Sequence, residues 1–164
     1  MSESPKQKST GGFILTLIIV MGLLFIGGSM LLGVLAGLIV PSVVIMEYKT
    51  DRAEVPANVD AIKVAQLAYD AAFDGYVSIP TPHPRAIDDL DREAVLWTVD
   101  AEGFETLAWG PDGPVRGTYW VEVSPDGEDF TVHGMIDADG DEVPAHYVAT
   151  PNESAHALTG PNVY

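Results

Sequence analysis

Residues 13–40 of the chain read FILTLIIVMGLLFIGGSMLLGVLAGLIV, a long uncharged stretch. None of its 28 residues is charged, and 20 of them are Leu, Ile, Val, Phe or Met. A helix of this length spans about 42 Å, whereas the hydrocarbon core of a bilayer is about 30 Å thick. The apolar run continues to Met46, so it is much longer than the apolar region of a cleaved secretory signal. The sequence therefore predicts a single transmembrane helix over residues 13–46.

The charges on the two sides of this helix indicate its orientation. Residues 1–12 hold two lysines and one glutamate, whereas the chain after Met46 holds 6 basic and 23 acidic residues. Positively charged flanks stay on the cytoplasmic side of a membrane. We therefore expect residues 1–12 to be a cytoplasmic leader and residues 47–164 to form a domain on the periplasmic or extracellular side of the inner membrane.

The charge balance and the absence of cysteine exclude several classes of function. The 164 residues include 8 basic and 24 acidic side chains, which gives a formal net charge of −16. Proteins bind DNA and RNA through Lys and Arg side chains that displace counterions from phosphates, so nucleic acid is not an expected partner. A chain without cysteine cannot form disulfides, thiolate metal sites or a cysteine nucleophile.

Small residues recur along one side of the apolar helix. Ser29, Gly33 and Gly37 are spaced at i, i+4 and i+8, so they form one stripe. Stripes of this kind allow two membrane helices to approach closely, which makes these residues a candidate helix-packing site. The alternative interpretation is that membrane helices are rich in glycine even where they do not pack.

An amphipathic helix is expected after the membrane segment. Two rows of mostly apolar residues repeat every seven positions, and charged residues occupy much of the opposite face. The rows consist of Val55, Ile62, Tyr69 and Tyr76, and of Val59, Gln66 and Phe73. This periodicity predicts a helix over residues 55–76 that packs one stripe against a core and ends near Gly75. Residues 78–85 hold three prolines, so a connecting loop is expected there.

The C-terminal half of the chain has the pattern of a β-sheet. After a short helical turn at residues 88–93, the hydrophobic period changes to two, and clusters of Gly, Pro and Asp separate the apolar runs. The predicted strands cover residues 95–99, 105–109, 117–123, 130–136 and 143–149. A long helix followed by consecutive antiparallel strands is an α+β fold.

This order of elements resembles that of type IV pilins and pseudopilins. The resemblance rests first on the pair Gly12-Phe13, which stands at the start of the apolar run, as a prepilin peptidase site does. It also rests on Asn58, Ile62, Ala65, Tyr69 and Tyr76 in the amphipathic helix, and on residues 115–119, 130–131, 136–141 and 161–164 near the C-terminus. The resemblance implies a long N-terminal helix, half transmembrane and half amphipathic, packed on an antiparallel sheet. It also implies that prepilin peptidase cleaves between Gly12 and Phe13.

The function implied by this resemblance is structural. The chain would be a minor pilin or pseudopilin of a type IV pilus or of a type II secretion-like system, anchored in the inner membrane. Its partners would be the membrane, other pilin-like subunits and the assembly platform of the pilus or secretion system.

Two departures from the family pattern favour an alternative function. Leu17 stands at the fifth position after the expected cleavage site, where family members usually carry Glu. An acid there offsets the N-terminal amine of a neighbouring subunit in an apolar helical core. Pro41 lies several residues later than the proline of the family. The alternative is a monomeric, membrane-tethered periplasmic binding domain that has kept the pilin fold and does not assemble.

Motifs for catalysis are missing from the sequence. It contains no Gly-rich phosphate loop, no G-x-S-x-G and no HExxH, so we expect no enzyme activity and disfavour a membrane-anchored hydrolase. His133 and His146 are expected to face each other across a hairpin, on the sheet face opposite Val132 and Ile136. Two ligands do not make a structural zinc site, and exposed strand histidines are the simpler interpretation.

An acidic turn is the candidate metal site. Asp137, Asp139 and Asp141 are spaced like the first three ligands of a calcium loop. Glu142 and Val148 stand where an EF-hand requires Gly and Glu, so the turn is not an EF-hand. The resemblance implies calcium here, because some pseudopilins bind it in this region. The alternative is that these aspartates only shape a hairpin connection.

Overall fold

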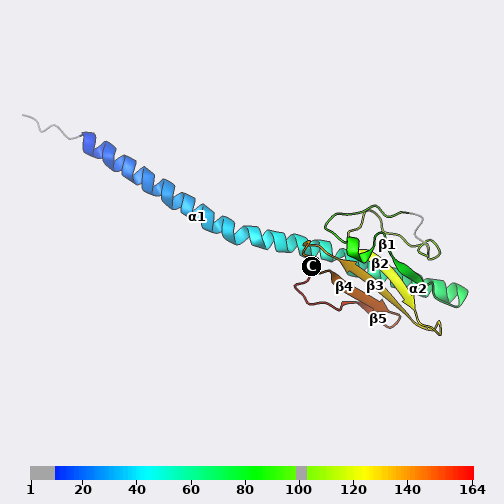
Figure 1. The fold of residues 1–164 in the computed structure, drawn as a ribbon. Coiled ribbons are helices and arrows are strands. Elements are labelled where there is room, and N and C mark those ends of the chain that lie inside the picture. Colours follow the sequence, from blue (N-terminus) through cyan, green and yellow to red (C-terminus); the bar gives the residue numbers. More distant parts are fainter. Residues whose placement is uncertain (1–9, 99–102) are drawn as a thin grey trace, which may run out of the picture. The chain divides into compact units, whose positions relative to one another are not determined.

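The computed structural model describes residues 10–98 and 103–164 and divides the chain into two compact units, Met1–Ile45 and Met46–Tyr164. Helix α1, Thr10–Arg52, is 43 residues long (Figure 1). Its residues up to Ile45 make up the described part of the first unit, and residues 46–52 belong to the second. Among the residues that the structure describes, no helix is both long and apolar enough to cross a membrane. Residues 26–41, which form much of the predicted transmembrane segment, have side chains outside that description.

The amphipathic helix predicted after the apolar run is α2, Glu54–Phe73. It follows α1 after a single residue, Ala53, whose φ of −67° and ψ of −16° are still helical. Pro56 has no N–H group to donate to the carbonyl of Arg52, which explains the interruption between the two helices. The helix ends slightly earlier than predicted, because Asp74 adopts a left-handed conformation and donates its N–H to the carbonyl of Asp70 at 2.8 Å.

The β-sheet has five strands in the order β1-β2-β3-β4-β5, and each strand is antiparallel to its neighbours. The strands are β1 Ile79–His83, β2 Thr118–Val123, β3 Phe130–Ile136, β4 Ala145–Thr150 and β5 Glu153–Ala157. Helix α2 packs on one face of this sheet, against β3, β4 and β5. The α+β class with an antiparallel sheet is therefore confirmed.

The core lies between α2 and the sheet. Val55, Val59 and Ile62 of the helix are completely buried. The sheet residues that meet them alternate along each strand, as expected for strands with one covered face. They include Tyr119, Val121, Val132, Ile136 and Ala149, all completely buried. Gly134 lets the helix approach, because a Cβ atom there would lie 2.6 Å from side-chain carbons of Val55 and Val59.

The C-terminal residues of the second unit pack on the last turns of α1. The guanidinium of Arg52 donates hydrogen bonds to the carbonyls of Pro161, at 2.9 Å, and Gly160, at 3.3 Å. It also lies 5.2 Å from the ring centroid of Tyr147. Tyr164, the last residue, is buried at 9% exposure. Residues 160–164 are therefore part of the packed domain.

Two of the predicted strands, 95–99 and 105–109, are wrong. In the described part of the first segment, Val95 makes one isolated bridge with Val115, and residues 103–108 form turns. The apolar residues of these segments pack their rings into the core from an irregular loop. Trp97 lies 5.1 Å from Phe104 and 5.3 Å from Trp109 between ring centroids. The apolar residues of these two segments are therefore explained by burial in a loop and do not mark strands.

Two strands occur where none was predicted. Residues 79–83 were expected to lie in a loop because of their prolines, but they form β1 at the edge of the sheet, where a missing N–H is tolerated. The other edge strand, β5, has the polar sequence ESAHA and is largely exposed. The predicted helical turn at 88–93 is a short 3₁₀ helix, η1, Ile87–Asp89.

Candidate functional site

The acidic turn between β3 and β4 is organised around Asp137, which is buried at 2% exposure. Its carboxylate accepts hydrogen bonds from the backbone N–H groups of Gly140, at 2.8 Å, Asp141, at 3.2 Å, and Glu142, at 3.0 Å. Gly140 has a φ of +74°, which a residue without Cβ adopts at little cost. Asp137, the first aspartate of the predicted site, therefore stabilises the backbone conformation of the turn.

The structure brings the three predicted metal ligands together. One carboxylate oxygen each from Asp137, Asp139 and Asp141 lie within 4.8 Å of one another. The Oδ1 atom of Asp139 is buried and has no hydrogen-bond partner in the described part of the chain. Burial raises the pKa of Asp139, and the neighbouring charge of Asp141 raises it further. The cluster can accept a cation or retain a proton on Asp139.

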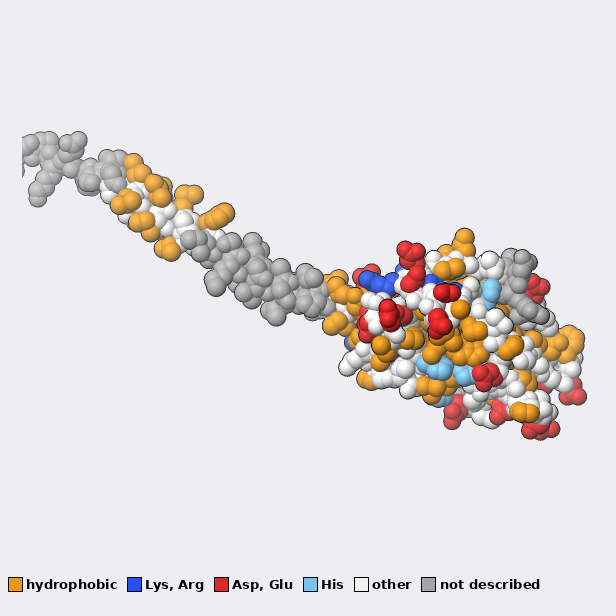
Figure 2. All heavy atoms as spheres, viewed as in Figure 1, with side chains coloured by type: hydrophobic (Ala, Val, Ile, Leu, Met, Phe, Trp, Pro, Cys, Tyr) orange, Lys and Arg blue, Asp and Glu red, His pale blue; other side chains and the backbone are white. Residues whose placement is uncertain are grey.

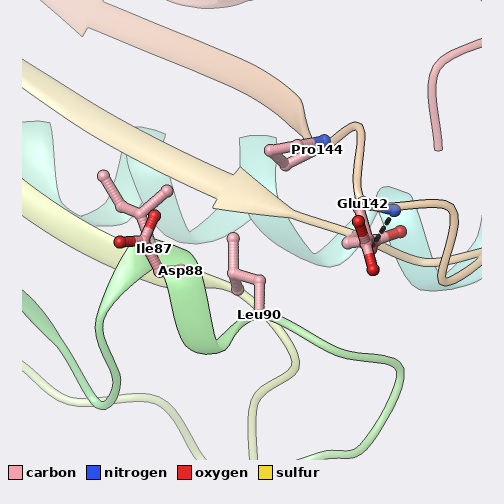
Figure 3. Close-up of a pocket in the computed structure, with 6 residues that line it drawn as sticks. Ile87, Asp88, Leu90, Glu142 and Pro144 are labelled. Carbon is pink, nitrogen blue, oxygen red and sulfur yellow. Dashed lines mark hydrogen bonds between the residues drawn. The ribbon is translucent and has the colours of Figure 1, made fainter.

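A pocket of about 360 Å³ adjoins this turn. It lies between η1 and the β3–β4 connection, and Figure 3 shows Ile87 and Leu90 from the η1 segment opposite Glu142 and Pro144. Its lining residues are Ile87, Asp88, Leu90, Asp137, Glu142 and Pro144. Three of these are acidic and none is basic.

The predicted histidine pair is present on the sheet face turned away from α2. His133 Nδ1 lies 3.1 Å from His146 Nε2, and the ring of Trp120 is parallel to that of His133 at 3° and 4.6 Å between centroids. The same indole lies 5.7 Å from the His146 ring. Figure 2 shows histidine side chains grouped beside hydrophobic ones and an acidic one on the visible surface of this unit.

The outward side of α2 is a further feature of interest. Together with Ala53 just before the helix, the uncharged residues on this side form what we call the outer stripe: Ala53, Ala57, Ala61, Val64, Ala68, Ala71 and Ala72. Val64 at its centre is 64% exposed. Asp60, at the border, turns aside and accepts a hydrogen bond from the N–H of Ala155 on β5 at 2.8 Å. The alanines of α2 are visible in the sequence, but only the position of the sheet shows which side of the helix stays uncovered.

The other predicted site residues lie on α1. Phe13 is 72% exposed, and the carbonyl of Gly12 accepts a hydrogen bond from the Thr16 hydroxyl at 2.9 Å. Ser29, Gly33 and Gly37 fall in residues 26–41, so their side-chain surroundings lie outside the described residues. The cleavage site and the packing stripe therefore stay predictions.

Comparison with known proteins found no match to this chain among protein-family models, curated proteins or solved structures.

Proposed function

We propose that this chain is a membrane-anchored, pilin-like structural subunit, a minor pilin or pseudopilin of a type IV pilus or of a type II secretion-like system. The observation that carries the proposal is the outer stripe of α2. A surface helix that faces water ordinarily has polar and charged residues on its outer side. Here the inner side packs on the sheet and the outer side presents only Ala and Val. This helix suits close packing against a helix of another subunit.

The charges on the rest of the second unit also favour contact between copies through the outer stripe. The chain after Met46 has 23 acidic and 6 basic residues, so two copies repel one another over most of their surfaces. The outer stripe carries no charge and is formed by small residues, which let helix backbones come close together. An assembly through α2 therefore avoids the repulsion that other faces would bring.

Cysteine crosslinking tests this proposal, because the chain has no cysteine of its own. In a bacterial host with a pilus or type II secretion system, full-length Val64→Cys should form a disulfide with a matching cysteine in a second copy. Glu128→Cys, at the exposed β2–β3 turn, is the matched control and should stay uncrosslinked. N-terminal sequencing of the same material should find Phe13 as the first residue.

The opposite outcome supports the alternative function. A chain that retains Met1 and gives no crosslink at position 64 is a monomeric, membrane-tethered binding domain. Leu17, in place of the usual acid, is the sequence feature that favours this alternative.

We also propose that the turn Asp137–Asp141 binds calcium. Three carboxylates so close together repel one another, and a divalent cation relieves that repulsion. The unpartnered Oδ1 of Asp139 and the acidic pocket beside the turn support a cation there. Oxygen ligands of this kind suit calcium, and extracytoplasmic sites function at affinities of about 10⁻⁴ to 10⁻³ M.

A further inference from the structure

The surroundings of the histidine pair indicate where its protons lie. A neutral imidazole has one N–H group and one nitrogen lone pair. His133 Nε2 is buried, has no hydrogen-bond partner among the described residues, and faces Glu122 Oε2 at 3.8 Å. The carboxylate attracts a proton on that nitrogen and would repel a lone pair. His133 therefore keeps its proton on Nε2, and the lone pair on Nδ1 points at His146 Nε2.

This arrangement matches that of a histidine bound to a metal. A coordinating imidazole usually donates its other N–H to a carboxylate, which fixes the tautomer and the ring orientation. The Glu122 carboxylate lies on this side of His133, 3.8 Å from Nε2, which is longer than a hydrogen bond. Trp120 Nε1 in turn donates a hydrogen bond to Glu122 at 3.4 Å, which holds the carboxylate near the pair.

The distance between the two facing nitrogens also suits a shared ion. Two nitrogens that each lie about 2.0–2.1 Å from a tetrahedral zinc ion are about 3.3 Å apart. His133 Nδ1 and His146 Nε2 are 3.1 Å apart. The β3–β4 pairing, which places Met135 opposite His146 and His133 opposite Val148, holds both rings on the same sheet face.

We propose that His133 Nδ1 and His146 Nε2 bind one divalent transition-metal ion of the kind that prefers imidazole, Zn²⁺, Cu²⁺ or Ni²⁺. When the ion binds, His146 carries its proton on Nδ1 and frees the lone pair of Nε2. Structural zinc sites have four protein ligands, whereas this one has two and leaves positions for water or for a ligand from another molecule. It is distinct from the Asp137 turn, whose carboxylates suit calcium.

Copper titration of the full-length chain, purified in detergent without a polyhistidine tag, tests the proposal. Cu²⁺ should quench tryptophan fluorescence to saturation at one equivalent, because Trp120 is stacked on both ligands. Calorimetry should give one site that binds Cu²⁺ more tightly than Ni²⁺ or Zn²⁺. His133→Gln combined with His146→Gln should abolish both signals. His156→Gln, an exposed histidine on β5, is the matched control and should change neither.

Glu122→Gln decides the question if the double histidine variant does not fold. The Glu122 side chain is 65% exposed, so its replacement should leave folding intact. Loss of the carboxylate should weaken Cu²⁺ binding about 10-fold or more. Glu128→Gln, in an exposed turn, should leave the affinity unchanged.

Three results would overturn the proposal. The first is the absence of saturable Cu²⁺ binding to the wild-type chain. The second is one-site binding that persists in a folded double histidine variant. The third is unchanged affinity in Glu122→Gln.

Discussion

Two polar side chains of α2, the half-buried Glu54 and the buried Gln66, connect the helix to distant parts of the second unit. The Glu54 carboxylate accepts hydrogen bonds from the backbone N–H of Arg116, at 3.0 Å, and from the hydroxyl of Tyr119, also at 3.0 Å. Burial raises the pKa of Tyr119, and the Glu54 charge raises it further, so the hydroxyl remains a proton donor. Gln66 pairs with both backbone groups of Val77, at 2.7 and 2.9 Å. These contacts fix where each end of α2 lies on the sheet.

Replacing Gln66 tests how much such a contact contributes to the free energy of unfolding. Gln66→Leu leaves the N–H and the C=O of the half-buried Val77 without their partner, so we expect the free energy of unfolding to fall by about 1–3 kcal/mol. Chemical denaturation monitored by circular dichroism measures it. Ala68→Leu, at an exposed position of the same helix, should change stability by less than about 0.5 kcal/mol. Equal losses in the two variants would mean that the amide pairing contributes little.

The histidine pair should also make stability depend on pH. Burial lowers the pKa of His133, and burial together with His133 lowers that of His146, below their ordinary value of about 6.5. The unfolded chain therefore takes up protons at a higher pH than the folded chain. The contribution of the pair to the free energy of unfolding should be fully present above pH about 6.5. It should decrease as the pH falls through that value.

Urea denaturation in the presence of a chelator, between pH about 7.5 and 5.5, measures this dependence. The double variant His133→Gln, His146→Gln should show a flatter dependence. His83, whose pKa burial also lowers, remains in both proteins and accounts for the residual slope. Identical slopes in the two proteins would show that the pair titrates alike in the folded and unfolded states.

At the scale of elements, the sequence predicted a strand correctly where burial sets a regular pattern of apolar residues. Strand β3 was predictable because its exposure alternates residue by residue. Residues 105–109 were mistaken for a strand, because Trp109 is apolar for its packing on Phe104 in a loop that has no regular period. Strand β5 was missed because backbone pairing holds an exposed polar edge strand without any side-chain pattern.

The candidate sites were predictable to different degrees. The aspartates of the acidic turn lie within six residues of one another, so their spacing alone predicted that they would meet. The histidine pair needed only the β3–β4 register in addition. The pocket beside the turn was not predictable, because η1 comes from a segment about fifty residues earlier in the chain.

The contact between α2 and β3 allows a steric test at Gly134. Gly134→Ala adds a methyl group where Val55 and Val59 already lie, so we expect a loss of about 1–3 kcal/mol in the free energy of unfolding. Gly75→Ala, where nothing lies within 4 Å of the added Cβ atom, is the matched control. A second change, Val59→Ala, should remove part of the clash, so the double variant should lose less than the sum of the single variants. Strict additivity would contradict this close approach.

The acidic turn gives a prediction about calcium. With a dissociation constant near 1 mM, roughly 5 mM calcium should stabilise the folded chain by about 1 kcal/mol and raise Tm by a few degrees. Asp139→Asn should remove the increase, and Glu128→Gln should retain it. Thermal melting of the full chain in calcium and in chelator measures the effect. Identical melting curves would show that the three aspartates only shape the hairpin connection.

At the scale of the whole molecule, charge and apolar surface are separated along the chain. Residues 13–40 have no charge, and the second unit has a large excess of acid that repels another copy. The outer stripe of α2 is an uncharged helical surface within this acidic unit. Because exposed charges are screened by salt, association through the stripe should strengthen as ionic strength rises.

The stripe in α1 should act together with the outer stripe of α2. Gly33→Leu combined with Gly37→Leu adds bulk only on the side that is expected to face a neighbouring helix, so it should lower the crosslinking yield of Val64→Cys. Membrane insertion should persist, because leucine favours the bilayer more than glycine does. Gly28→Leu adds one leucine on another side of the helix and should leave the yield unchanged. Quantitative crosslinking in isolated membranes measures the yields. An equal yield in all three proteins would mean that subunits meet through α2 alone, without close packing of the apolar helices.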